Sequence, residues 1–225
     1  MSGIGSCSRR VVSRCREMAY AGAPMPMDSV QQSRPPALRL FVALQLPVEV
    51  RTALQCVQAE LRELLPRGSA SWTPPENMHL TLRFLGNVPA QQVVVVKAKL
   101  HSALVGFGAL DLRCERVGGF PDLRFPRVIW AGVHDAEDKL PQLQQRVDAA
   151  VREFCERPTE ERFVGHVTLA RPKQLKRAEA ERLARFAEAA AKRSCGQWRC
   201  TEIELIASEL AAGGSRYTTL DVLPL

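Results

Sequence analysis

Long hydrophobic runs are missing from this 225-residue sequence. Apolar blocks such as residues 93–96 stay far below the roughly 20 residues of a membrane-spanning helix, which argues against an integral membrane protein. The seven cysteines include no Cys-x-x-Cys spacing, so neither a disulfide scaffold nor a structural zinc site is expected. The glycine-rich phosphate loops of Rossmann and P-loop proteins are also missing, which leaves those nucleotide sites without support.

The chain has the composition of a globular protein with an excess of positive charge. Apolar residues make up 46% and charged residues 24%, as in ordinary folded domains. The 31 lysines and arginines outnumber the 24 acidic residues, giving a net charge of +7. This charge weakly favours anionic partners such as RNA or nucleotides. The odd number of cysteines, without Cys-x-x-Cys spacing, separately leads us to expect a cytoplasmic protein with reduced thiols.

Residues 1–36 are expected to form a disordered N-terminal extension, and residues 37–225 to form the folded domain. The extension is rich in Ser, Arg, Gly and Pro, lacks hydrophobic periodicity and ends in two prolines. Its first sixteen residues hold four arginines and no acid, somewhat like a transit peptide. An upstream start codon, with Met25 or Met27 as the true beginning, is the other interpretation.

From Leu38 onward the spacing of apolar residues indicates mixed strands and helices. Alternation over 38–44 predicts a strand, and apolar residues three or four apart after Pro47 predict a helix that ends before Gly68. The later elements are expected in this order: strand 78–85, helix 89–104, strand 127–133, helix 140–154, strand 165–170, a helix around 183–190, and strands 198–207 and 216–223 joined through Gly213-Gly214.

The sharpest feature is a tetrapeptide pattern that occurs twice, as His79-Leu80-Thr81-Leu82 and as His166-Val167-Thr168-Leu169. The second copy follows the first by 87 positions, one in each half of the domain, which indicates two similar lobes. Because side chains at i and i+2 of a strand share a face, each copy presents one imidazole and one hydroxyl on the same side.

Strand alternation also makes predictions for the residues that follow each motif. In the first copy, Phe84 is expected in the core and Arg83 on the face of His79. In the second copy, Arg171 has the opposite parity to His166 and needs a local twist to turn toward it. Which arginine faces the histidines is left open.

Two other interpretations of the motifs compete with a catalytic one. A single His-x-Thr strand is usually ordinary surface or core, but half of the four histidines fall in this repeated pattern. Two histidines could also bind zinc, yet a catalytic zinc site needs three protein ligands. Threonine is a poor ligand, and no Asp, Glu or Cys follows either histidine at i+2 or i+4. A metal is therefore the weaker interpretation.

Two imidazoles and two hydroxyls on one surface suit an in-line displacement at phosphorus. Because histidine titrates near pH 6.5, one ring can accept a proton from water while the other donates one to the departing oxygen. Threonine hydroxyls can donate hydrogen bonds to the non-bridging oxygens, whose charge grows toward the transition state, and an arginine can add a clamp.

The paired motifs resemble the two HxTx signatures of the two-histidine phosphoesterase superfamily. Other landmarks extend the match over about residues 38–225, in the same order: Leu40-Phe41-Val42-Ala43-Leu44, Arg83-Phe84-Leu85-Gly86, Phe120-Pro121, Arg127-Val128-Ile129-Trp130, Ala170-Arg171 and Gly214-Ser215-Arg216-Tyr217. Together they look like the RNA 2′,3′-cyclic phosphodiesterase branch, also known as 2′-5′ RNA ligase.

The resemblance implies a bilobal, pseudo-symmetric α+β fold, with two antiparallel sheets facing across a central cleft and helices outside. It implies metal-independent hydrolysis of a 2′,3′-cyclic phosphate to a 2′-phosphomonoester, without a cofactor, and reversible 2′-5′ ligation in some members. By that similarity His79 is the proton donor and His166 the proton acceptor, while Thr81, Thr168 and Arg171 hold the phosphate.

The expected partners are RNA ends or small nucleotides with a 2′,3′-cyclic phosphate, bound by a monomer without a membrane or a metal. The alternative is a module that binds nucleotides or RNA in the same cleft without turnover. Histidine in both motifs favours turnover, because binding alone would need only the threonines and an arginine.

Overall fold

The computed structural model describes residues 36–158, 162–211 and 214–225. The predicted extension therefore lies outside the described residues, apart from residue 36, and so does Gly213 of the predicted final turn. In the described part the chain forms these elements: β1 (Ala37–Gln45), α1 (Val48–Leu64), β2 (Ala70–Trp72), η1 (Pro75–Asn77), β3 (His79–Pro89), η2 (Ala90–Gln92), α2 (Val93–Leu104), β4 (Leu110–Phe120), β5 (Val128–Asp135), α3 (Lys139–Val151), η3 (Arg152–Phe154), β6 (His166–Pro172), α4 (Arg177–Ala189), β7 (Ser194–Cys200), β8 (Glu202–Ala211) and β9 (Gly214–Pro224).

These strands form one antiparallel sheet of nine strands. Its order is β7-β4-β5-β6-β3-β1-β8-β9, with β2 paired to β6. Strands β3 and β6 are joined by a single residue pair, Leu80 with Val167, so the sheet has two halves that meet at the middle residues of the two motifs. The α+β class is confirmed, and the two expected sheets are continuous through this pair.

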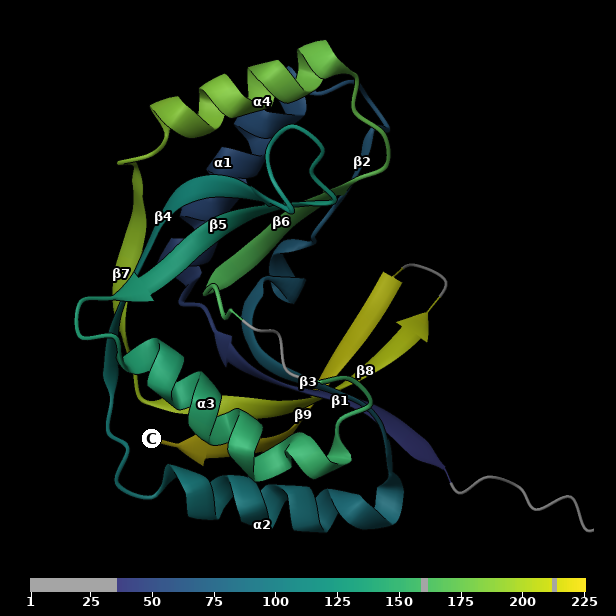
Figure 1. The fold of residues 1–225 in the computed structure, drawn as a ribbon, viewed down its shortest axis with the longest axis vertical. Coiled ribbons are helices and arrows are strands. Elements are labelled where there is room, and N and C mark those ends of the chain that lie inside the picture. Colours follow the sequence, from purple (N-terminus) through teal and green to yellow (C-terminus); the bar gives the residue numbers. More distant parts are fainter. Residues whose placement is uncertain (1–35, 159–161, 212–213) are drawn as a thin grey trace, which may run out of the picture. The chain divides into compact units, whose positions relative to one another are not determined.

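The helices pack on the sheet in two pairs (Figure 1). Helices α1 and α4 contact each other and the half that contains β4, β6 and β7, while α2 and α3 contact each other and the half that contains β3 and β9. In the part of the chain that the structure describes, no helix is both long enough and apolar enough to span a membrane.

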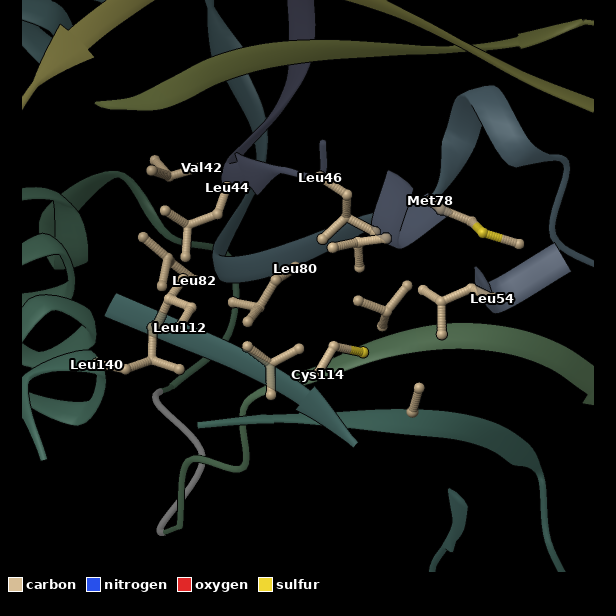
Figure 2. Packing of buried hydrophobic residues seen from close by; sticks show 14 of the residues in the cluster. Val42, Leu44, Leu46, Leu54, Met78, Leu80, Leu82, Leu112, Cys114 and Leu140 are labelled. Atoms are coloured by element: carbon tan, nitrogen blue, oxygen red, sulfur yellow. The ribbon is translucent and has the colours of Figure 1, made fainter. Parts of the chain in front are cut away.

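One hydrophobic core extends through both halves. The apolar side of α1 buries Val50, Leu54 and further residues at helical spacing, as predicted from the sequence. Figure 2 shows Leu80 and Leu82 among these core side chains, with Leu112 of β4 nearby. Leu80 and Leu82 are both buried, as expected for the residues that alternate with His79 and Thr81 in a strand.

A β-bulge in β3 changes which side chains face the core. Val42 of β1 pairs with Arg83 and Ala43 pairs with Thr81, so Leu82 has no opposite residue in β1. An extra residue of this kind reverses the alternation beyond it. Arg83 is therefore buried and Phe84 is 57% exposed, so both predictions made from strict alternation are wrong.

A bulge at the corresponding place in β6 acts on Arg171. Ile129 of β5 pairs with Ala170 and Trp130 pairs with Thr168, which leaves Leu169 without an opposite residue. Ala170 is buried and Arg171 is exposed. Strict alternation places Arg171 on the face opposite to His166. The bulge reverses the direction of its side chain, so that Arg171 lies on the same face as Thr168.

The buried Arg83 forms an ion pair instead of facing the histidines. Its Nε lies 3.0 Å from Oδ1 of Asp148 on α3, and both side chains are almost fully buried. Its terminal nitrogens donate hydrogen bonds to the carbonyl oxygens of Arg157 (2.7 Å) and Pro158 (3.2 Å). Arg83 therefore ties β3 to α3 and to the segment that follows it. A hollow of about 520 Å³ adjoins this ion pair, and neither motif histidine lines it.

We expect Arg83→Ala to lower the free energy of unfolding by about 3–5 kcal/mol, because it removes the buried partner of a buried carboxylate. Urea denaturation monitored by circular dichroism measures the loss. Arg152→Ala is the matched control, because Arg152 contacts the same Asp148 at 3.2 Å but is 66% exposed, and it should cost less than about 1 kcal/mol. Equal losses in the two variants would contradict the buried ion pair as the cause.

Candidate active site

The Leu80–Val167 pair sets the geometry of the site. Both side chains are fully buried, so the residues on either side of them in each strand point to the opposite face of the sheet. We call this the histidine face, and it carries His79, Thr81, His166 and Thr168, all partly buried. The two predicted histidines and the two predicted threonines are thus brought to one surface.

The two imidazoles are held in the same way. Nδ1 of His79 lies 2.8 Å from the carbonyl oxygen of Asn77, and Nδ1 of His166 lies 2.8 Å from that of Val164. A carbonyl only accepts hydrogen bonds, so each Nδ1 must carry the proton and donate it. In the neutral ring Nε2 is then the basic nitrogen, and in the charged ring it is a second proton donor.

Aromatic rings surround each histidine. The ring of His79 lies 4.9 Å from that of Phe41 and 5.3 Å from that of Tyr217. The side chain of Asn77 donates a hydrogen bond to the carbonyl oxygen of Ser215 (3.0 Å), which ties the start of β9, and with it Tyr217, to this place. The ring of His166 lies 5.0 Å from that of Phe120. These packed rings restrict the orientation of both imidazoles.

Burial strongly affects the protonation of His79. Loss of solvent lowers the pKa of its imidazole to about 4, although the carbonyl of Asn77 favours the charged ring, and the charge of a protonated His166 lowers the pKa further. At neutral pH His79 is therefore uncharged in the ligand-free protein.

The two threonine hydroxyls remain available to a ligand. Neither the hydroxyl of Thr81 nor that of Thr168 forms a hydrogen bond with another residue in the described part of the chain. Each lies two residues beyond its histidine on the same face. Both can therefore donate to an oxyanion bound between the histidines.

The halves of the site differ at one equivalent position. Phe84 and Arg171 each lie five residues after the histidine of their motif, and each is turned to the histidine face by a bulge. The ring of Phe84 lies 5.8 Å from that of Phe41, which in turn contacts His79. The site thus has an apolar aromatic end and a cationic end. Sequence reasoning missed Phe84, because strict alternation places it in the core.

The other histidines do not join the site. Nε2 of His101 lies 3.2 Å from a carboxylate oxygen of Asp221, and Nε2 of His134 lies 3.5 Å from one of Glu115. Within the described ranges, no three His, Cys, Asp or Glu side chains come together as metal ligands.

Comparison with known proteins identifies the family. A family model described as LigT-like phosphoesterase matches two consecutive segments, residues 44–130 and 132–217, and each contains one motif. The RNA 2′,3′-cyclic phosphodiesterase of Methanothermobacter thermautotrophicus is 28% identical over 84% of this chain and 99% of its own length. The protein of the same name from Thermus thermophilus is 32% identical over 84% of this chain and 90% of its own length.

Solved structures agree with this assignment. The structure of TT0787 from Thermus thermophilus has a TM-score of 0.67 and 29% identity, covering 84% of this chain and 98% of that one. Escherichia coli LigT complexed with 3′-AMP has a TM-score of 0.66 and 25% identity, covering 84% of this chain and 99% of that one. The chain belongs to the LigT-like phosphoesterase family, and its class is that of a phosphoesterase.

The low pKa of His79 predicts acid-sensitive stability. The unfolded chain takes up a proton near the ordinary pKa of 6.5, whereas the folded chain resists it down to about 4. His79 therefore does not lower the free energy of unfolding above pH 6.5. As the pH falls toward 4, proton uptake by the unfolded chain lowers the free energy of unfolding by no more than about 3 kcal/mol.

Urea denaturation at pH 7 and at pH 4.5 measures this loss, which should be smaller in His79→Gln. His101→Gln, which removes a half-exposed histidine, serves as the control and should keep the wild-type difference between the two pH values. An unchanged difference in His79→Gln would show that another group causes the acid sensitivity.

Proposed function

We propose that this protein hydrolyses the 2′,3′-cyclic phosphate of RNA ends or nucleotides to a 2′-phosphomonoester, using His79 and His166 as acid and base without a metal. The observation that carries the proposal is the Leu80–Val167 pair, which brings both HxTx motifs to one face. The curated relatives named RNA 2′,3′-cyclic phosphodiesterase support the same reaction.

The reaction is an in-line displacement at phosphorus. His166 accepts a proton from a water molecule through Nε2, and the water oxygen forms a bond to phosphorus. The bond from phosphorus to the 3′-oxygen breaks, and His79 donates a proton from Nε2 to that oxygen. The products are a 3′-hydroxyl and a 2′-phosphomonoester. A 5′-hydroxyl in place of water would give a 2′-5′ phosphodiester by the same steps.

Charge stabilisation comes from the groups around the two rings. Thr81 and Thr168 donate hydrogen bonds to the non-bridging oxygens, and Arg171 holds the anion from the cationic end of the site. The exposed ring of Phe84 offers a flat apolar surface for the nucleobase at the other end. A nucleotide has both an anion and a flat ring system, so its chemistry matches the two unlike ends.

His79 must gain its proton when the substrate binds, because its pKa in the ligand-free protein is about 4. An anionic phosphate beside the ring favours the charged imidazole and raises this pKa. Substrate binding thus converts His79 into an acid. All of these side chains come from one chain, and we propose that the enzyme acts as a monomer in the cytoplasm.

Hydrolysis of a nucleoside 2′,3′-cyclic phosphate, with chromatographic identification of the product, tests the reaction. The expected product is the 2′-phosphomonoester, at a rate unaffected by EDTA. His79→Ala and His166→Ala should each lower kcat by about 10²–10⁴-fold while keeping the wild-type circular dichroism spectrum. A 3′ product, or inhibition by EDTA that zinc reverses, would contradict the proposed chemistry. Binding without turnover would favour a nucleotide-binding module.

A substrate with sulfur as the 3′ leaving atom separates the two roles. A thiol is far more acidic than an alcohol, so a departing thiolate needs no proton. His79→Ala should therefore recover most of its lost kcat/KM on the 3′-thio substrate, whereas His166→Ala should not. Recovery in His166→Ala instead would reverse the assignment of acid and base.

A further inference from the structure

The loop between β4 and β5, residues 121–127, presents an unusual side chain to solvent. Phe125 is 77% exposed, although a phenylalanine is among the residues that folded proteins most readily bury. Its neighbours on this loop include Arg124 and Arg127, which are also exposed. We refer to Arg124, Phe125 and Arg127 as the loop surface. Arg124 also forms an ion pair with Asp122 at 3.1 Å, but its side chain is 82% exposed. An aromatic ring flanked by two exposed arginines is thus left open to solvent.

Hydrogen bonds and packing define the shape of this loop. One carboxylate oxygen of Asp122 accepts hydrogen bonds from the backbone N–H groups of Arg124 (2.7 Å) and Phe125 (3.1 Å). Pro126 is buried, and it lies so close to Gly119 of β4 that a Cβ on that glycine would be 3.0 Å from it. Phe125 is therefore held outward by an ordered turn between anchored neighbours.

The loop surface continues from the cationic end of the active site. Strand β4 enters the loop from Phe120, whose ring lies 5.0 Å from that of His166. Strand β5 leaves the loop at Val128, and the next residue, Ile129, pairs with Ala170, which directly precedes Arg171. The loop thus emerges from the end of the sheet where β6 carries Arg171.

We propose that the loop surface binds the nucleotides that precede the reacting 3′ end of an RNA strand. A base stacks on Phe125, and the phosphates between the nucleotides lie against Arg124 and Arg127. A polyanion with flat rings matches this alternation of cation and aromatic group, whereas a protein partner would favour a wider apolar patch. The inference rests on the proposed function, and it adds a preference for RNA ends over mononucleotides.

The test compares a nucleoside 2′,3′-cyclic phosphate with a short oligoribonucleotide, three to six nucleotides long, that ends in the same group. We expect Phe125→Ala to lower kcat/KM for the oligonucleotide about tenfold, mainly through KM, because stacking of one base is lost. Its kcat/KM for the mononucleotide should stay at the wild-type value. Phe84→Ala, by contrast, should lower kcat/KM for both substrates.

Two controls sharpen the comparison. Leu210→Ala removes a side chain that is 81% exposed on a different hairpin, and it should leave both substrates unaffected. Phe125→Trp keeps a stacking ring and should retain the oligonucleotide activity. Arg127→Gln should reduce the slope of log KM against log salt concentration for the oligonucleotide by about one. The reason is that the variant makes one phosphate contact fewer, so that binding releases one counterion fewer.

Two results would overturn the inference. The first is that Phe125→Ala leaves the oligonucleotide rate unchanged, as Leu210→Ala does, which would leave a protein partner as the use of the loop. The second is that Phe125→Ala lowers the rates of both substrates equally. If the wild type hydrolyses neither substrate, the proposed function fails separately. Fluorescence anisotropy with a labelled oligoribonucleotide 3′-phosphate then decides the inference, because Phe125→Ala must still weaken binding.

Discussion

The single contact between Leu80 and Val167 organises the whole site. Within the described part of the chain it is the one strand pairing between β3 and β6, and it joins the two halves of the sheet at the middle of both motifs. Because both side chains are buried in the core, the side chains of the flanking histidines and threonines point to the opposite face of the sheet. A hydrophobic pair thus fixes the relative position of the polar groups without touching a ligand.

The histidines themselves could be predicted from the sequence, whereas their surroundings could not. A repeated His-x-Thr pattern in two strands needs only the two-residue period of a strand, so the shared face of His79 and Thr81 follows directly. Arg83 and Phe84 were assigned to the wrong faces because a β-bulge leaves no mark in the pattern of apolar residues. The apolar pattern also does not predict the strand Leu110–Phe120, and the single strand predicted over 198–207 falls on two strands, Ser194–Cys200 and Glu202–Ala211.

The same bulge has opposite consequences in the two halves. In β3 it sends a cation inward, where Arg83 meets Asp148, and it sends an aromatic ring outward. In β6 the inward residue is Ala170, which needs no partner, and the outward residue is Arg171. Duplicated backbone geometry therefore presents different chemistry at equivalent positions, and the proposed nucleotide ligand is asymmetric in the same sense, with a flat ring at one end and an anion at the other.

That asymmetry also bears on how two similar histidines acquire different roles. Both rings donate Nδ1–H to a carbonyl two residues earlier, so their tautomers alone cannot distinguish acid from base. His79, however, is packed between Phe41 and Tyr217, and burial lowers its pKa to about 4. A ring that resists protonation in the empty site becomes charged only beside an anion. In the proposed reaction, the substrate phosphate would therefore supply the condition under which His79 can act as the acid, so that proton transfer depends on binding.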